Sequence, residues 1–257
     1  MAIVPEPTAG RIITTTGGFV YFQITTWGIP SATFFIGSVS SERPPDIDAI
    51  EKMFKIVEAL NEWIPKYRKS NILKGEPATN AAIISIHGGL AFRPSKVPPI
   101  CKLFLEVDTM PGQHNMNVVQ EVEALIEKVK KEDPDMKVDV QTLAAAVGSE
   151  ISSEEHIVKV LSKFHKKVTS NEANINWCGY FADTTALTMA GIPALCYGPG
   201  GRVRTGGSNY YPQEGEHCYL PDIADGVKIF IGTSMEVCSM TRDEYCNLQV
   251  KEKNTVV

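Results

Sequence analysis

The chain has 257 residues, a net charge of −5, 43% hydrophobic residues and 21% charged residues. This composition is typical of a globular protein with one large domain or two ordinary ones. The acidic balance argues against a nucleic-acid or anionic-membrane surface. No apolar run reaches the roughly 18 residues of a membrane span, and residues 1–10 lack the basic and apolar regions of a signal peptide. The sequence therefore predicts neither nucleic-acid nor membrane partners.

The six cysteines form no CxxC pair, and several lie in apolar segments such as "NWCGYF" and "ALCYG". Cysteines of this kind are typically buried free thiols in a reducing compartment. We therefore expect a cytoplasmic protein without a disulfide framework.

The first part of the chain alternates strand and helix patterns. Residues 11–27, rich in Ile, Thr, Val and aromatics, predict two strands, or one strand broken at Gly17-Gly18. Residues 46–63 carry apolar side chains with helical periodicity, and Asp46 is the expected N-cap. The other expected elements are strands at 80–90, 100–109 and 136–143 and an amphipathic helix at 114–132.

This order, β-α-β-β-α-β, is the ferredoxin-like pattern, with one antiparallel sheet covered by two helices on one face. The other face of the sheet stays free to meet a partner. Residues 146–257 predict an α/β region with few strands, which cannot bury a full sheet unaided. Its expected elements are a helix at 152–169 with a capping box at Ser152 or Ser153, a short helix in 179–191 with Asp183 as N-cap, a strand in 192–198 and an amphipathic helix at 222–240.

Three segments contain residue types that are suited to binding a metal ion or a ligand. Glu6 lies in "VPEPT", where the flanking prolines hold its carboxylate in an extended turn. His217 lies in "EGEHCYL", and a histidine beside carboxylates is either a metal ligand or a solvated loop residue. In "GPGGRVRTGG" the glycines permit close approach of a ligand to the backbone, with Arg202 and Arg204 as anion contacts. The alternative is a surface loop with solvated arginines.

These segments, in this order, resemble the M20 family of zinc-dependent amidohydrolases and peptidases. "IVPEPTAGRIITTTGGFVYFQITTWG" resembles the family passage that enters its lid domain, and "ISIHGGLAFRPSKVPPICKLFLEVDTMPGQ" resembles the lid hairpin. The most specific match is "GYFADTTALTMAGIPALCYGPGG", which resembles the family's "GGTDAR…GIPtv.fGPG". The resemblance covers almost the whole chain, but only the C-terminal part of the family.

The resemblance implies an α/β protein with a ferredoxin-like βαββαβ lid and dimerisation domain at residues 11–145. An incomplete α/β zinc-hydrolase catalytic domain would comprise residues 1–10 and 146–257. The family's upstream ligands and its general base have no counterpart in these residues. The resemblance therefore implies a partner chain carrying the N-terminal catalytic half, and it permits a homo-oligomer through the lid.

The resemblance also assigns candidate site residues. Glu6 matches a metal-binding glutamate, and His217 is the histidine available for the C-terminal metal ligand. In an equally good register, Glu216 takes the position of the glutamate that follows that ligand, and the histidine is missing. The lid histidine and lid arginine of the family fall near Ala32 and Thr109. The candidate contacts for a small carboxylate-bearing substrate are Arg93, Gly198, Gly200, Gly201, Arg202 and Arg204.

Two classes of function follow. In the first, the chain takes part in metal-dependent hydrolysis of an amide bond in an N-acyl amino acid or small peptide. One or two zinc ions, or cobalt or manganese, would polarise the carbonyl and activate water. In the second, the chain is a non-catalytic lid, dimerisation or ligand-binding module, or a fragment of such an enzyme. A freestanding ferredoxin-like binding domain would leave "GIPALCYGPGG" unexplained.

Overall fold

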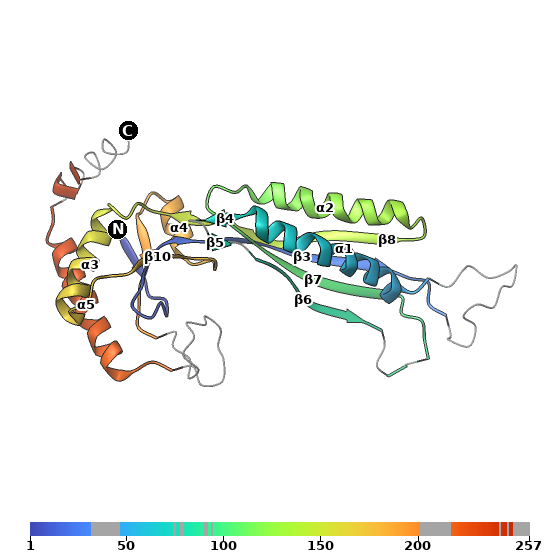
Figure 1. Ribbon diagram of the computed structural model, residues 1–257, viewed down its shortest axis with the longest axis horizontal. Helices are drawn as coiled ribbons and strands as arrows, with labels where there is room; N and C mark the ends of the chain where they lie inside the picture. Colours follow the sequence, from blue (N-terminus) through green and yellow to red (C-terminus); the bar gives the residue numbers. More distant parts are fainter. Residues whose placement is uncertain are drawn as a thin grey trace, which may run out of the picture. The chain divides into compact units, whose positions relative to one another are not determined.

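The structure is a computed structural model, which describes residues 1–31, 47–73, 76–77, 80–89, 92–93, 95–200, 217–241, 243–245 and 247–248. The chain divides into two compact units (Figure 1). The ferredoxin-like unit comprises Gly17–Gly148, and the α/β unit comprises Met1–Thr16 and Ser149–Val257. The divisions fall after residues 16 and 148, whereas the sequence placed them after residues 10 and 145. The reason is that the strand at residues 12–16 pairs within the α/β unit.

The ferredoxin-like unit has the predicted β-α-β-β-α-β order. Its main elements are β3 (Gly18–Trp27), α1 (Ala49–Ser70), β6 (Ala81–Gly88), β7 (Ile100–Thr109), α2 (Asn115–Glu132) and β8 (Lys137–Ala146). The sheet has the strand order β6-β7-β3-β8, with every pairing antiparallel. Both helices cover one face of this sheet (Figure 1). A short hairpin of β4 (Ile72–Leu73) and β5 (Glu76–Pro77) follows α1.

The core of this unit is formed by side chains that alternate between buried and exposed along the strands, and by apolar side chains at helical spacing in α1 and α2. Along β7, every second side chain is buried, from Cys101 to Thr109, as expected for a strand with one covered face. The helices contribute the facing layer, with Met53, Ile56 and Leu60 from α1 and Val118, Val122 and Ile126 from α2. The opposite face of the sheet exposes Tyr21, Ile84 and Leu143.

Helix α1 differs from the prediction at both ends. Its N-cap is Asp48, whose carboxylate accepts hydrogen bonds from the backbone N–H groups of Ile50 (2.7 Å) and Glu51 (3.4 Å). The expected cap, Asp46, lies outside the described residues. The helix continues through Pro65 to Ser70. Burial of Tyr67, whose hydroxyl donates to the carbonyl of Asp108 at 2.6 Å, stabilises these last turns despite the proline.

The α/β unit is built on a small mixed sheet. Its strands are β1 (Ala2–Val4), β2 (Ile12–Thr16), β9 (Ser149–Glu150), β10 (Ile175–Cys178) and β11 (Ala194–Cys196). The order is β1-β11-β2-β10, with β9 paired to β2. Strands β1 and β11 are parallel, whereas β2 runs antiparallel to β11. The buried strand predicted in "IPALCYG" is therefore confirmed as β11.

The helices of this unit are α3 (His156–Thr169), α4 (Thr184–Met189) and α5 (Leu220–Cys238). Helices α3 and α5 pack through one cluster with Ile12 and Leu195 of the sheet. The expected capping box of α3 is wrong. The helix begins after Glu155, and the Ser152 hydroxyl instead accepts the backbone N–H of Glu154 in the preceding turn. No helix in the described ranges combines the length and apolar character that crossing a membrane requires.

Candidate functional site

The turn that carries Glu6 lies beside the loop that follows β11. Because β1 and β11 are parallel and adjacent, they end at the same edge of the sheet. The backbone N–H of Tyr197 donates to the carbonyl of Val4 at 3.1 Å, which extends this pairing. Gly198 then packs directly against Glu6: a Cβ on Gly198 would lie 2.5 Å from the Glu6 carbonyl oxygen. The end of this strand thus requires glycine, because a side chain on Gly198 would collide with the Glu6 carbonyl oxygen.

Glu6 has a second carboxylate as its neighbour. Burial raises the pKa of Glu6 above its ordinary value, and the nearby negative charge of Asp183 raises that pKa further. Asp183 occupies the predicted N-cap position of α4, but its side chain makes no capping hydrogen bond. Among the described residues neither carboxylate has an ion-pair partner. Two uncompensated carboxylates at one edge favour a proton or a cation between them.

The neighbourhood of this pair is apolar and holds two thiols. Burial is the main cause that raises the pKa values of Cys178 and Cys196, each to about 12, and the charge of Glu6 adds to both shifts. These side chains cluster with Ile13 and Ala182. Both cysteines therefore stay protonated at neutral pH, which makes them poor nucleophiles.

A polar cavity of about 460 Å³ borders the same edge, with Gly10, His165, Tyr197 and Asp225 among its lining residues. The ring nitrogen Nδ1 of His165 lies 2.8 Å from the Tyr197 hydroxyl, and both side chains are buried. Burial lowers the pKa of His165 and raises that of Tyr197 to about 12. Both groups are thus neutral near pH 7. Their hydrogen bond therefore stabilises the turn and places no charge in the cavity.

The predicted site residues are brought together only in part. Glu6 and Gly198 are in contact, and Gly200 lies nearby with a φ of +90°, near Pro7 and Cys218. The positive φ explains why this position favours glycine. His217 is half-buried, with its ring 4.9 Å from the ring of Tyr219.

The other predicted contacts lie outside the described residues or belong to the other unit. Gly201, Arg202 and Arg204 lie outside the described residues, as do Ala32 and Glu216. Arg93 is exposed in the ferredoxin-like unit.

The described residues do not by themselves make a metal centre. Among them, no group of three or more His, Cys, Asp or Glu side chains is placed to hold an ion. Structural and catalytic zinc sites use three or four protein ligands. Glu6 and Asp183 fit part of such a set, because the charge of Asp183 acts on Glu6 and neither carboxylate has an ion-pair partner among the described residues. Asp183 was predicted only as a helix cap, although it lies in the passage that resembles "GGTDAR".

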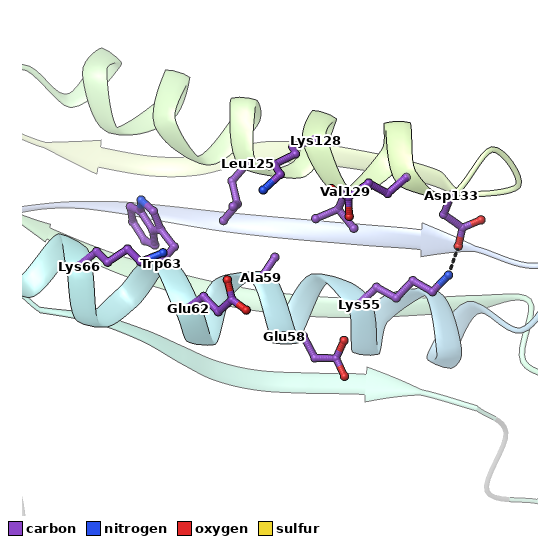
Figure 2. Close-up of a pocket in the computed structure, with 11 residues that line it drawn as sticks. Lys55, Glu58, Ala59, Glu62, Trp63, Lys66, Leu125, Lys128, Val129 and Asp133 are labelled. Carbon is purple, nitrogen blue, oxygen red and sulfur yellow. Dashed lines mark hydrogen bonds and ion pairs between the residues drawn. The ribbon is translucent and has the colours of Figure 1, made fainter.

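A separate groove of about 560 Å³ lies between α1 and α2 (Figure 2). Its lining combines the apolar Trp63, Leu125 and Val129 with charged residues of both helices. At one end, Asp133 pairs with Lys55 (Figure 2). None of the predicted site residues lines this groove.

Part of the ferredoxin-like unit matches a known protein family. Residues 39–134 match the family model of the peptidase dimerisation domain of M20 enzymes. Among curated proteins, N-formyl-4-amino-5-aminomethyl-2-methylpyrimidine deformylase of Halalkalibacterium halodurans is 28% identical over 168 residues, which are 59% of this chain and 38% of the deformylase.

Solved structures extend the likeness across both units. Aminopeptidase PepT from Bacillus cereus has a TM-score of 0.62 at 16% identity, over 92% of this chain and 56% of its own. Human carnosine dipeptidase 1 has a TM-score of 0.67 at 11% identity, over 92% of this chain and 58% of its own. At these identities the likeness shows the fold, and the chain spans about half the length of these proteins. The chain thus contains a peptidase dimerisation domain of the M20 family, within the fold of the M20 peptidases and amidohydrolases.

Proposed function

We propose that this chain takes part in metal-dependent hydrolysis of an amide bond, in an N-acyl amino acid or a small peptide. The match to the peptidase dimerisation domain supports hydrolase ancestry. The names of the similar proteins, a deformylase, an aminopeptidase and a dipeptidase, all describe cleavage of a bond to an amide-type nitrogen. The five cysteines among the described residues are free, which is in keeping with a cytoplasmic location.

The observation that carries this proposal is the effect of the Asp183 charge on Glu6, which follows β1 at the end that this strand shares with β11. The pKa of Glu6 is raised by burial and by Asp183, so a bound cation would stabilise the two negative charges. Glu6 would supply one oxygen ligand to zinc, cobalt or manganese. In hydrolases such an ion polarises the scissile carbonyl and lowers the pKa of bound water.

In this proposal Glu6 and Asp183 make up only part of the active site. Further ligands and a general base would come from the half of the M20 catalytic domain that these 257 residues do not include, for example on a partner chain. His217 would add a ligand. Arg93, Arg202 and Arg204 would hold a substrate carboxylate, because guanidinium groups bind carboxylates in a bidentate fashion.

The test is Glu6→Gln in the assembled enzyme, with Glu154→Gln as the matched control. Glu154 is an exposed glutamate of the same unit and pairs with Lys159. Loss of a metal ligand predicts at least about a 100-fold fall in hydrolysis of formyl-amines and dipeptides, together with loss of bound metal measured by elemental analysis. The control should retain both. Full activity and full metal content in the Glu6 variant would show that Glu6 is not a metal ligand.

A second candidate is a non-catalytic lid and dimerisation module, and two observations favour it. The described residues hold no three-ligand cluster. Thr109, near the position of the family's lid arginine, is buried, and its hydroxyl donates to Asn115 at 3.2 Å. This candidate predicts a homo-oligomer in light scattering, without bound metal and without hydrolysis of any substrate in the same panel.

A further inference from the structure

The uncovered face of the ferredoxin-like sheet carries a pocket of about 430 Å³, to which all four strands contribute. Along β7 the side chains alternate, so that Phe104 and Glu106 lie on the side opposite to the buried Leu103 and Leu105. We call the following five lining residues the open-face pocket: Tyr21 of β3, Ile84 of β6, Phe104 and Glu106 of β7, and Leu143 of β8.

Two β-bulges supply apolar walls of this pocket. On β6 the pairing with β7 skips Ile84, and on β8 the pairing with β3 skips Leu143. A bulge leaves its extra residue unpaired and re-aims the side chain, and bulges are frequent beside functional sites. Both extra residues line the pocket, where they are 58% and 47% exposed. The two outer strands of the sheet thus each depart from regular pairing at the residue that borders the pocket.

A carboxylate lies in this apolar surrounding. Glu106 is the one charged residue among the described residues that line the pocket, and Asp108 follows it on the same side of β7. Among the described residues, neither carboxylate forms an ion pair. Lys102, on the same side of β7, is four residues from Glu106, which is about 13 Å along a strand. After burial, which is the larger cause, the charge of Glu106 raises the pKa values of Tyr21 and Asp108. The negative charge at this pocket is therefore uncompensated.

We propose that the open-face pocket binds a small organic amine in its protonated form, with an aromatic ring or a short alkyl chain as its body. The volume of the pocket is that of a small-molecule site, which combines apolar walls with a few polar groups. The body of the amine lies against Tyr21, Phe104 and Leu143 and removes their apolar surface from water. The ammonium group pairs with Glu106 beside the aromatic rings, whose faces attract cations. This inference does not depend on the proposed function, because all these residues belong to the ferredoxin-like unit and binding requires no hydrolysis.

The experiment is a fluorine NMR titration of the full chain with para-fluorophenethylammonium. The corresponding para-fluorinated alcohol and carboxylate are the neutral and anionic control probes. We expect the amine to bind with a dissociation constant of about 1 mM or below, and both control probes to bind at least about tenfold more weakly, since they cannot pair with Glu106. Equal binding of the amine and the alcohol would overturn the inference, because the pocket would then not recognise charge. No binding of the amine up to about 10 mM would also overturn it.

Three variants test whether the amine binds at this pocket. Glu106→Gln keeps the size of the side chain but removes its charge, and should weaken binding of the amine by about tenfold while leaving binding of the alcohol unchanged. Leu143→Lys places a positive charge in the opposite wall and should weaken binding of the amine by a similar factor, with Glu106 intact. Asp139→Asn is the control, an exposed aspartate on β8 that does not line the pocket, and should bind the amine as the wild type does. Binding of the amine that survives Glu106→Gln or Leu143→Lys would overturn the inference. An equal loss in Asp139→Asn would also overturn it, because binding would then follow net charge alone.

Discussion

The hydroxyl of Thr8 makes two hydrogen bonds to a single residue, Gly198. It accepts the backbone N–H of Gly198 at 3.1 Å and donates to its carbonyl at 3.2 Å. The backbone N–H of Gly10 donates to the same carbonyl at 3.0 Å. Thr8 is completely buried. The turn that presents Glu6 is therefore fixed to the end of β11 by polar contacts as well as by strand pairing.

Replacement of Thr8 by valine should loosen this turn. Valine keeps the shape of threonine but leaves the N–H of Gly198 without its buried partner, which costs about 1–3 kcal/mol. We expect faster amide exchange in peptides covering residues 1–16 and 192–200, measured by hydrogen-exchange mass spectrometry. Thr8→Ser keeps the hydroxyl and should retain most of the protection. Equal exchange in wild type and the valine variant would show that the hydroxyl contributes nothing.

Gly198→Ala should disturb the same edge through steric contact. The new methyl group would lie 2.5 Å from the Glu6 carbonyl oxygen, so the turn must move. We expect a loss of about 2 kcal/mol or more in the free energy of unfolding of the α/β unit. Gly191→Ala is the control, because Gly191 has a φ of +77° but nothing within 4 Å. It should lose only about 1 kcal/mol, for backbone strain. An equal loss in both variants would contradict the steric explanation.

The sequence predicted the ferredoxin-like unit well because its strands are long and its helices are strongly periodic. Strand β7 alternates over its whole length, and α1 repeats its buried residues from Met53 to Ile64. One feature escaped this reasoning. Residues 11–27 predicted two strands, or one strand broken at Gly17-Gly18, but not that β2 and β3 belong to different units. Periodicity cannot show which sheet a strand joins.

The candidate site was predicted less completely, for a related reason. Glu6 and the glycines of "GPG" stood out by local context, and the structure places Gly198 against Glu6. Asp183 did not stand out, because an aspartate before a short helix is usually a cap. Its significance comes from the fold, since α4 packs beside β1 and β11.

Asp108 should make the ferredoxin-like unit less stable as pH rises. Burial, followed by the charge of Glu106, raises the pKa of Asp108 to about 7. A folded-state pKa above the unfolded value contributes stability below the unfolded pKa, near 4, which is lost up to pH 7. Asp108→Asn should remove this slope and gain about 2 kcal/mol at pH 8, after allowance for solvent screening.

Urea unfolding between pH 4.5 and 8 measures this effect. In a Trp177→Phe background, the fluorescence of Trp27 and Trp63 reports the ferredoxin-like unit alone, since both lie within it. Asp139→Asn, an exposed aspartate on β8, should leave the pH slope of the wild type unchanged. A slope that persists in the Asp108 variant would show that another group titrates in this range.

Asp133 should have the opposite pH dependence. Its carboxylate pairs with Lys52 and Lys55 at 2.7 Å, and these hydrogen bonds lower its pKa to about 2. A lowered pKa contributes stability above the unfolded value, near 4, which is lost as pH falls toward 2. Asp133→Asn should therefore cost about 1–3 kcal/mol at pH 7, and less at pH 3, in the same tryptophan-reported unfolding.

The neighbouring Asp135 provides the control for this prediction, because it is exposed. Asp135→Asn keeps the backbone N–H that donates to Asp133 at 3.2 Å and should be nearly neutral at both pH values. The contrast matters because Asp133 lies just after α2 while its lysine partners lie on α1. If Asp133→Asn were as mild as Asp135→Asn, the apolar contacts alone would hold the two helices together. The ion pairs would then contribute nothing measurable to the free energy of unfolding.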